Sequence, residues 1–587
     1  MRNVRIVRGR WLLLVLAVAL AGLAVLLPSR ARTLDDAGAI GAPVRGTIHV
    51  HTRRSDGSGT IDDVAAAAAR AGLRFVVFSD HGDATRTPQP PAYRHGVLCI
   101  DAIEVATFAG HVLAIGLQGE APYPLGGEPR DVIDDVARLG GMSVAAHPTS
   151  AKPALRWQDW SSRFDGLEWL NADSEWRDER PLTLLAALLT YPFRRAETLT
   201  SLLDRPGDVL ARWDQLLRTR RVVGLAGADA HASMVNGEDN PYSDRSPIAL
   251  PAYEQSFKTF SVAVPDVHLS GEAAADARLV VDAVRSGDLY TSIEGLAHPA
   301  RLSFVARSGA EQAHSGQVLR VGGPVTLDVH TNAPAGARIV LIHDGQRAAD
   351  ANGSSLTYRT DSTSGFYRAE VYLRAKDAGN AVPWIVSNPI YLGEPAGASP
   401  PPFVASKESV LYRDGILGDV HGASAGASAP SPADAWPSGW GIEASDKSRG
   451  VLDLARVNNE VRLVLQYTLG GTKDDSPWVA LGTPAGADLP SFDHLAFRGR
   501  ANRPMRIWVQ FWRPVPTGNE YWRRSVYLDP VERDIVIPYS ELVPSNATTP
   551  RVVPLTAIVS VQFVVDGVHT PLGESGQFWI GNVRYQR

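Results

Sequence analysis

Two hydrophobic patterns divide the chain at about residue 300. Before this point, apolar runs such as RFVVFSDH (74–81) and MSVAAHP (142–148) each end in polar residues, as parallel strands covered on both faces do. Between the runs, residues 61–72 (IDDVAAAAARAG) and 130–141 (RDVIDDVARLGG) begin with acids and stop at glycine, which predicts helices. This alternation predicts a strand–helix barrel over residues 44–300, with polar side chains at the carboxyl ends of its strands.

After residue 300 the apolar positions alternate over short runs. Over residues 301–395 the runs RLSFVAR, VTLDVHT and ARIVLIHDG are separated by turn residues, which predicts an immunoglobulin-like β-sandwich that caps the barrel. Residues 396–403 are rich in proline, alanine and glycine and predict a linker. The runs HLAFRGR, MRIWVQFW and GQFWIGNVRYQ predict a second all-β sandwich over residues 404–587. The expected fold class is therefore multidomain.

The N-terminal segment, residues 1–33, predicts a membrane helix. Its first ten residues hold four arginines and no acid, and an apolar run of seventeen residues follows from Trp11 to Leu27. This length is near the lower limit for a helix that crosses a bilayer. We expect an uncleaved signal-anchor with the remaining domains exported to the periplasm or the cell exterior. Secretion after signal cleavage is the alternative.

Charge and cysteine content narrow the class of protein further. The net charge of −5 offers no basic footprint for duplex nucleic acid. The single cysteine, Cys99, excludes an intrachain disulfide framework, so the exported domains must be stabilised by their hydrophobic cores.

Nine imidazoles and carboxylates lie at or just after the apolar runs of the predicted barrel. They are His49 and His51 (TIHVHT), Asp56 (RSDG), His81 (VVFSDH), Glu104 (AIEVA), His111 (AGHVLAIG), His147 (VAAHP), and Asp229 and His231 (LAGADAH). Residues two apart in a strand point to the same side, so each HxH or DxH pair can present two ligands to one site.

Each of these residues taken alone has an ordinary explanation as a turn, capping or packed residue. Together they do not, because buried ionisable groups are costly unless they are paired or bound to metal. Imidazole combined with carboxylate suits Zn, Mn or Fe and argues against calcium. The sequence therefore predicts a site for two to three divalent metals at the mouth of the barrel.

The order HxH, SDG, DH, E, H, HP, DxH resembles the PHP (polymerase and histidinol phosphatase) family of metallophosphoesterases. This resemblance implies a distorted seven-stranded (β/α) barrel and up to three metals. It also implies that Glu104 bridges two metals. One set of ligands would be His49, His51, Glu104 and Asp229; a second would be Glu104, His111 and His147; a third would be Asp56, His81 and His231. Glu104, His81 and Asp229 are the residues expected to take part in catalysis.

A metal-activated hydroxide needs no Ser, Cys or Lys nucleophile, and it attacks phosphoryl and carbonyl centres alike. The expected activity is phosphoester hydrolysis on a small-molecule substrate. The alternative is cleavage of carboxyl or carbamate esters, since the chain also resembles the CehA/McbA-type metallohydrolases. A further alternative is a non-catalytic protein that binds glycan or envelope material.

The last predicted sandwich resembles carbohydrate-binding modules of the galactose-binding-like, jelly-roll type. Seven of the fourteen tryptophans lie in it, and aromatic faces stack on sugar rings. The seven are Trp436, Trp440, Trp478, Trp508, Trp512, Trp522 and Trp579. Because Trp508 and Trp512 fall on one face of a strand, we expect some of the seven to belong to a core rather than to a glycan site.

Overall fold

The computed structural model describes most of the chain, in two compact units. The described residues are 17, 21–35, 40–233, 250–379, 381–395, 397, 403–412, 424–425, 439–457, 460–516, 518–546 and 549–587. One unit comprises residues 1–120 and 132–398, and the other comprises residues 121–131 and 399–587. Most of the predicted membrane segment and of the predicted linker, together with Trp436, lies outside the described residues.

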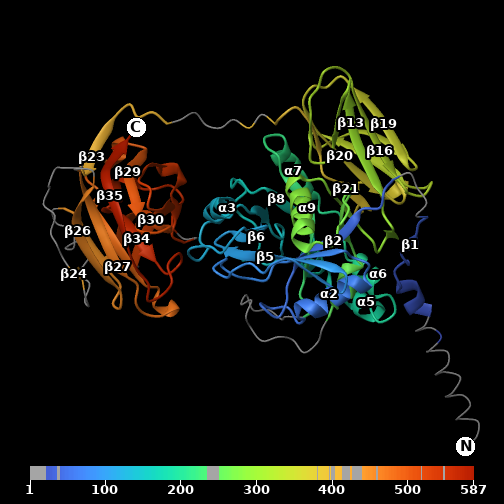
Figure 1. Ribbon diagram of the computed structural model, residues 1–587, viewed down its shortest axis with the longest axis horizontal. Helices are drawn as coiled ribbons and strands as arrows, with labels where there is room; N and C mark the ends of the chain where they lie inside the picture. Colours follow the sequence, from blue (N-terminus) through green and yellow to red (C-terminus); the bar gives the residue numbers. More distant parts are fainter. Residues whose placement is uncertain are drawn as a thin grey trace, which may run out of the picture. The chain divides into compact units, whose positions relative to one another are not determined.

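Seven strands close into a barrel in the first unit; Figure 1 labels β2, β5, β6 and β8 among them. Around the ring they are β2 (Val44–Val50), β3 (Phe75–Phe78), β5 (Val97–Thr107), β6 (Gly110–Ile115), β7 (Met142–Ala145), β8 (Gly166–Asn171) and β9 (Val223–Ala230). Strand β9 pairs again with β2, which closes the ring. Buried side chains such as Ile48, Leu113 and Leu225 belong to its core. The predicted closed seven-stranded barrel is confirmed.

The barrel does not keep a strict strand–helix alternation. Strands β5 and β6 form a hairpin, in which Thr107 pairs with Gly110, and β6 is antiparallel to both β5 and β7. The other neighbouring pairs in the ring are parallel. No helix separates β5 from β6, because the turn at residues 108–109 leaves no room for one. The same turn places Glu104 and His111 on adjacent strands.

The two helices predicted from the sequence are present as α2 and α3. Thr60 and Asp63 form a capping box in which Thr60 Oγ accepts from Asp63 N at 3.2 Å, and helix α2 follows directly. The helices are α2 (Ile61–Arg70), α3 (Pro129–Arg138), α4 (Ala172–Arg177), α5 (Pro181–Thr190), α6 (Arg195–Thr200), α7 (Gly207–Leu217), α8 (Tyr253–Phe257) and α9 (Ala273–Ser286). Four of them, α4 to α7, form one excursion between β8 and β9.

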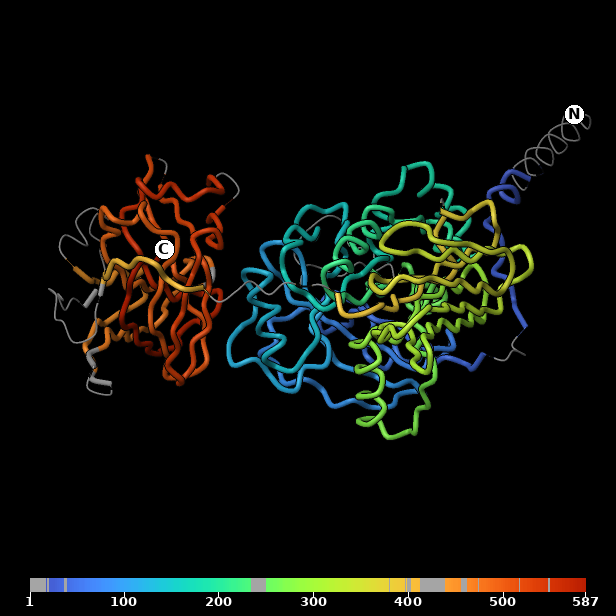
Figure 2. Tube along the Cα trace, turned by 90° about the horizontal axis from the view of Figure 1, so that it is seen from above, coloured from blue at the N-terminus to red at the C-terminus, as the bar shows by residue number. Residues whose placement is uncertain are grey.

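The first β-sandwich shares a sheet with the barrel (Figures 1 and 2). Strand β10 (Ser261–Val264) pairs with β2, β11 (Tyr290–Ser292) pairs with β10, and β21 (Ile385–Ser387) pairs with β11. The remaining strands of this sheet are β15 (Val318–Leu319), β17 (Arg338–His343), β18 (Gln346–Asn352), β20 (Gly365–Tyr372) and β22 (Ile390–Leu392), with β4 (Ala92–Arg94) beside β5. The facing sheet contains β13 (Leu302–Ser308), β14 (Glu311–His314), β16 (Val325–Thr331) and β19 (Ser355–Thr360).

Strand β20 has two buried faces, and this explains its unusual charges. Tyr367, Ala369 and Val371 belong to the core of the sandwich. Arg368 and Glu370 alternate with them and point to the other face, where the Arg368 guanidinium lies 3.0 Å from the Asp214 carboxylate of α7. Both arginine and glutamate side chains are almost completely buried. Ion pairs therefore join the sandwich to the barrel helices.

The second unit is a two-sheet β-sandwich around one large core, which includes Trp440 and Trp522. One sheet contains β23 (Glu408–Tyr412), β24 (Ser424–Ala425), β26 (Arg449–Val457), β27 (Glu460–Thr468), β29 (His494–Ala501), β32 (Arg533–Pro538) and β35 (Ser575–Gln586). The other contains β25 (Gly441–Ala444), β28 (Trp478–Pro484), β30 (Met505–Val515), β31 (Gly518–Leu528), β33 (Val543–Pro544) and β34 (Ser560–Asp566). The predicted sandwich is confirmed.

A segment from an earlier part of the chain, residues 121–131, also belongs to this second unit. The Asp131 carboxylate is completely buried, 3.2 Å from the Arg506 guanidinium of β30. The Tyr123 ring centroid lies 6.4 Å from that of Tyr527 in β31.

Within the described residues of the chain, no helix has the length and apolar character needed to cross a bilayer.

We predict that Arg368→Met destabilises the first unit, because it leaves the buried Asp214 carboxylate without its cation. Breaking a buried ion pair in this way costs about 3–5 kcal/mol. The matched control is Arg338→Met, since the Arg338–Asp350 pair lies at the surface and such pairs contribute about 1 kcal/mol or less. Urea unfolding followed by circular dichroism measures both, and equal shifts of the two midpoints would contradict the prediction.

Candidate metal centre

The nine predicted side chains meet at one end of the barrel, and the backbone bends to bring them there. His49, His147 and Asp229 have positive φ angles of 67°, 31° and 44°, which non-glycine residues seldom adopt. The pairing register of β2 also shifts between Ile48 and Val50, on either side of His49. The HxH pair therefore reaches its site through an irregular strand end rather than through the plain alternation expected from the sequence.

The Glu104 carboxylate lies at the centre of the cluster. Its Oε1 is 2.8 Å from His111 Nδ1 and 2.8 Å from His147 Nε2. Its Oε2 is 3.2 Å from Nε2 of both His49 and His51, and 3.3 Å from His81 Nδ1. The two oxygens thus face two different sets of imidazoles, which is the geometry of a carboxylate able to bridge two cations.

The Asp229 carboxylate adds a second acid to the set around Oε2. Its Oδ1 lies 3.2 Å from His49 Nε2 and 3.3 Å from His51 Nε2. His49, His51 and Glu104 are at most 1% exposed, so this part of the cluster is closed to solvent.

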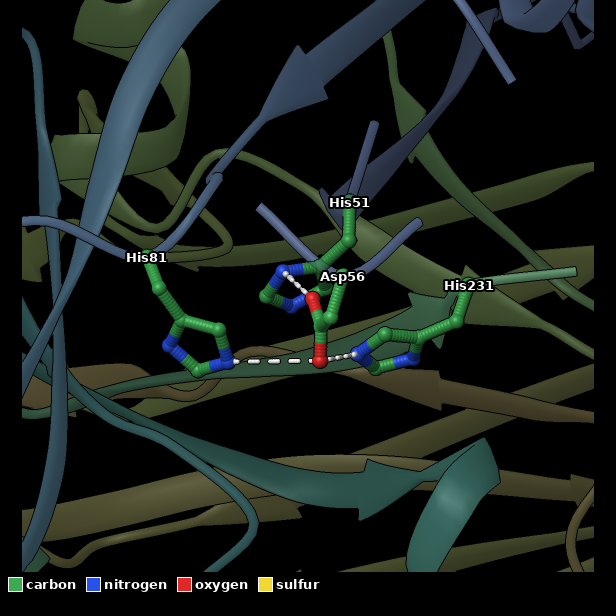
Figure 3. Close-up of side chains that lie close together, drawn as sticks. All are labelled: His51, Asp56, His81 and His231. Atoms are coloured by element: carbon green, nitrogen blue, oxygen red, sulfur yellow. Dashed lines mark ion pairs between the residues drawn. The ribbon is translucent and has the colours of Figure 1, made fainter. Parts of the chain in front are cut away.

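Asp56 organises the more open part of the cluster, where three imidazoles surround it (Figure 3). Asp56 Oδ2 lies 3.1 Å from His231 Nε2 and 3.7 Å from His81 Nε2, and Oδ1 lies 3.3 Å from His51 Nδ1. The side chains of Asp56, His81 and His231 are 11–18% exposed. Solvent therefore reaches the cluster from this side.

The donor atoms fit a set of divalent metals. Four groups bring their ligand atoms within 4.8 Å of one another, and together they use all nine residues: His51/Asp56/His81/His231, His49/His147/Asp229, His49/His51/Glu104 and His81/Glu104/His111. The buried Nε2 of His51 makes no hydrogen bond within the described part of the chain, although two carboxylate oxygens lie close to it. A buried nitrogen lone pair aimed between two carboxylates suits a cation.

The electrostatics of the cluster show why it needs positive charge. Burial lowers the pKa of His49, but Asp229 and the neighbouring glutamates outweigh burial and raise this pKa well above its usual value. Burial raises the pKa of Glu104, yet His81 and His49 outweigh it and hold this pKa well below the usual range. His81 differs, since burial lowers its pKa to about 4 and leaves a neutral imidazole at neutral pH.

Glu168 is a tenth acidic or imidazole side chain at the centre, and it is not among the residues predicted from the sequence; it is 1% exposed. Its Oε1 lies 2.7 Å from His49 Nδ1, and its Oε2 accepts from His147 N at 2.7 Å and from Asn171 Nδ2 at 2.8 Å. An acceptor on Nδ1 fixes the tautomer of His49 and leaves Nε2 free for a metal. Glu168 lies inside the apolar run GLEWLN, and no recognisable motif surrounds it. The only sequence feature that indicates a role for Glu168 is an acid within an apolar run.

Glycine at position 227 makes room for Glu168. A Cβ atom at Gly227 in β9 would lie 1.8 Å from Glu168 Oε1, so a side chain at this position would displace the Glu168 carboxylate. The glycine of the LAGADAH motif is thus required by a carboxylate on the neighbouring strand.

A second buried acid, Asp80, orders the loop that presents Asp56. Its Oδ1 accepts from Thr52 N at 2.6 Å and from Ser55 Oγ at 2.9 Å. Arg54 lies beside it, with Nε 2.9 Å from Asp80 Oδ2 and a second ion pair to Asp101. Arg54, one of the loop arginines near the ligands, is therefore engaged by two carboxylates.

Comparisons with known proteins find partial similarities among solved structures. No protein-family model and no curated protein matches the chain. Several solved structures resemble part of it. A family 11 carbohydrate-binding module of the cellulosomal cellulase Lic26A-Cel5E of Clostridium thermocellum is 15% identical, over 31% of this chain and 96% of that one, with a TM-score of 0.23.

Two further similar structures are also carbohydrate-binding modules. A family 11 module from Clostridium thermocellum in complex with a β-1,3-1,4-mixed-linked tetrasaccharide is 16% identical, over 25% of this chain and 88% of that one, with a TM-score of 0.21. A family 30 carbohydrate-binding module is 9% identical, over 30% of this chain and 97% of that one, with a TM-score of 0.21. The resemblance to the PHP family stays a prediction from the motifs.

We predict that Glu168→Gln lowers metal affinity by about 10–100-fold, the usual effect of removing a carboxylate behind a ligand histidine. Gly227→Ala is expected to act in the same direction, because its Cβ displaces the Glu168 carboxylate. Isothermal titration calorimetry with Zn²⁺ and Mn²⁺ measures the affinities. Matched controls are Glu254→Gln, a surface residue paired with Lys258, and Gly119→Ala, whose Cβ meets no atom within 4 Å. Wild-type affinity in Glu168→Gln would exclude the positioning role.

Proposed function

We propose that the chain is a metal-dependent hydrolase that acts on phosphoester bonds and uses two to three divalent metals, Mn, Zn or Fe. The observation that carries the proposal is the Glu104 carboxylate, which is buried and faces five imidazoles through two separate oxygens. A buried acid so placed has no structural purpose that an apolar residue would not serve better. The fold that carries it is, in this proposal, a distorted (β/α)₇ barrel.

The roles of the residues follow from their positions. His49, His51, Asp229, His111 and His147 would hold metals on the two sides of Glu104, and Asp56, His81 and His231 would hold another at the open side. Bound divalent metals would supply Lewis acidity and lower the pKa of a water molecule to near neutrality. Glu168 orients His49, and the closed interior excludes bulk water from the inner ligands. His81 and His231, at the open side, are the ligands nearest to an entering substrate.

Only the resemblance of the motifs to the PHP family indicates that the substrate is a phosphoester. The same ligands serve phosphoester and carboxyl or carbamate ester hydrolysis, and the second class is our alternative. We further propose that the chain is anchored in a membrane by its N-terminal segment with its domains exported, or else secreted after cleavage of that segment.

We predict that the double variant His49→Ala/His51→Ala loses bound metal and all turnover, because both imidazoles face Glu104 and Asp229. Elemental analysis of the purified chain gives the metal content. Chromogenic phosphomonoesters, phosphodiesters and carboxyl esters, with and without added Mn²⁺, give the activity. The control is His95→Ala, whose exposed imidazole pairs with Asp62 outside the cluster.

The outcomes of this screen are distinct. Phosphate release that requires metal supports the main proposal, and turnover of carboxyl esters alone moves the enzyme to the alternative class. Wild-type protein that binds no metal after reconstitution would overturn the hydrolase proposal.

Glycan binding by the C-terminal sandwich is the second candidate function. Trp478 and Trp579 are partly exposed in this unit, and the Trp579 ring lies 4.3 Å from the Arg500 guanidinium. By contrast, Trp508 and Trp512 are only 1% and 7% exposed. A sugar would therefore meet Trp478 or Trp579, since flat aromatic faces stack on sugar rings.

We predict that the chain is retarded in native gels that contain mixed-linked β-glucan, and that Trp579→Ala weakens the retardation. Loss of the indole removes the stacking surface without touching the core of the sandwich, to which Trp579 does not belong. Trp160→Ala, a partly exposed tryptophan of the first unit, is the control. Equal mobility of all three proteins with and without glucan would contradict glycan binding.

A further inference from the structure

Helix α5 and the turn after it expose an apolar surface that nothing in the described structure covers. The exposed fractions are 79% for Leu182, 51% for Leu185, 64% for Leu188, 50% for Leu189 and 64% for Phe193. These positions recur at helical spacing and therefore lie on one side of the helix. Contiguous exposed apolar patches of this kind mark sites of interaction.

The charge pattern around the surface suits a lipid–water interface. Residues 181–193 (PLTLLAALLTYPF) contain no charged side chain, and arginines flank them at Arg180, Arg194 and Arg195. Thirteen residues are too few to cross a bilayer, which takes about 20 in a helix. An apolar helix bounded by arginines instead lies along the interface, with its apolar side among the acyl chains and the guanidinium groups near the phosphates.

The position of the N-terminal segment supports the same occupant. The guanidinium of Arg194 donates to the carbonyl oxygen of Pro28, the residue that follows the apolar run Trp11–Leu27. Strand β1 (Arg32–Thr33) then pairs with β12 (Ala297–His298), which fixes this part of the chain to the first unit. Val25 and Leu26 are themselves 86% and 49% exposed, so they do not cover α5. The end of the predicted membrane segment and α5 thus lie on the same side of the unit.

We propose that α5, with Phe193, lies in the surface of a lipid bilayer and forms a second membrane contact beside the N-terminal segment. This contact orients the barrel with respect to the membrane. It is independent of the hydrolase proposal, because none of the residues involved belongs to the metal centre.

The test uses the full chain in phosphatidylcholine vesicles that contain phosphatidylglycerol. Cys99, the single cysteine, is 7% exposed, so an environment-sensitive thiol dye reports on introduced cysteines and the wild-type chain is the blank. The dye is placed at Leu185→Cys, and at Leu279→Cys as the matched control, since Leu279 is an exposed leucine on helix α9. We expect a quencher on the lipid acyl chains to remove most of the fluorescence at position 185 and little at position 279, with the opposite order for iodide.

Three results would overturn the proposal. Equal quenching by iodide at both positions would mean that α5 faces water, and protection of position 185 from both quenchers would mean that protein, such as a second copy of the chain, covers it. A second variant guards against misfolding: Leu185→Glu/Leu188→Glu with the dye at Phe193→Cys is expected to lose lipid quenching while the thermal unfolding midpoint is kept. Leu279→Glu is its control, and unchanged lipid quenching at position 193 in the double variant would also overturn the proposal.

Discussion

The arrangement of the strands in the first unit depends on the charge of one buried carboxylate. Glu104 is 1% exposed, and a carboxylate moved from water to such a place is costly unless cations or donors surround it. Five imidazoles do so, and they come from the ends of three strands, β2, β6 and β7, and from the turn after β3. A closed ring of strands brings the ends of several strands together at one spot. The positive φ angles of His49, His147 and Asp229 show that the backbone is strained where these residues converge.

The layer behind the ligands follows from the same constraint. Imidazoles that crowd a carboxylate must each be held in one tautomer and one orientation, and this requires acceptors on their far side. Glu168 provides one for His49, and Gly227 has to lack a side chain so that Glu168 fits. Asn171 connects this layer to the ligands, because its Nδ2 donates to both Glu168 and Asp229. The layer behind His49 is therefore built by three neighbouring strands, β2, β8 and β9.

The sequence could reveal the ligands but not this supporting layer. Nine ionisable residues at the ends of apolar runs stand out, because such residues are rare where strands are buried on both faces. Glu168 has no comparable signal, since its value depends on which strand becomes the neighbour of β9. The same holds for the β5–β6 hairpin and for the pairing of β21 with β11, which joins the first sandwich to the barrel sheet. The spacing of apolar residues and the position of turn residues predict a strand. Packing between distant segments determines which other strand it pairs with.

One excursion of the chain links the centre to the apolar surface of α5. Strand β8 carries Glu168 and ends at Asn171, whose side-chain oxygen accepts from Ser174 N and so starts helix α4. Helix α5 begins at Pro181, a few residues later, and the excursion returns through α7 to β9, which carries Asp229. In the proposed arrangement, the lipid surface would hold α5. This helix belongs to a segment that starts after Glu168 in β8 and ends before Asp229 in β9, and both residues belong to the metal centre. In the proposed exported enzyme, anchored through its N-terminal segment, this second contact would keep the open side of the centre at a fixed distance from the lipid surface. A single anchor followed by a short connection would leave that distance undefined.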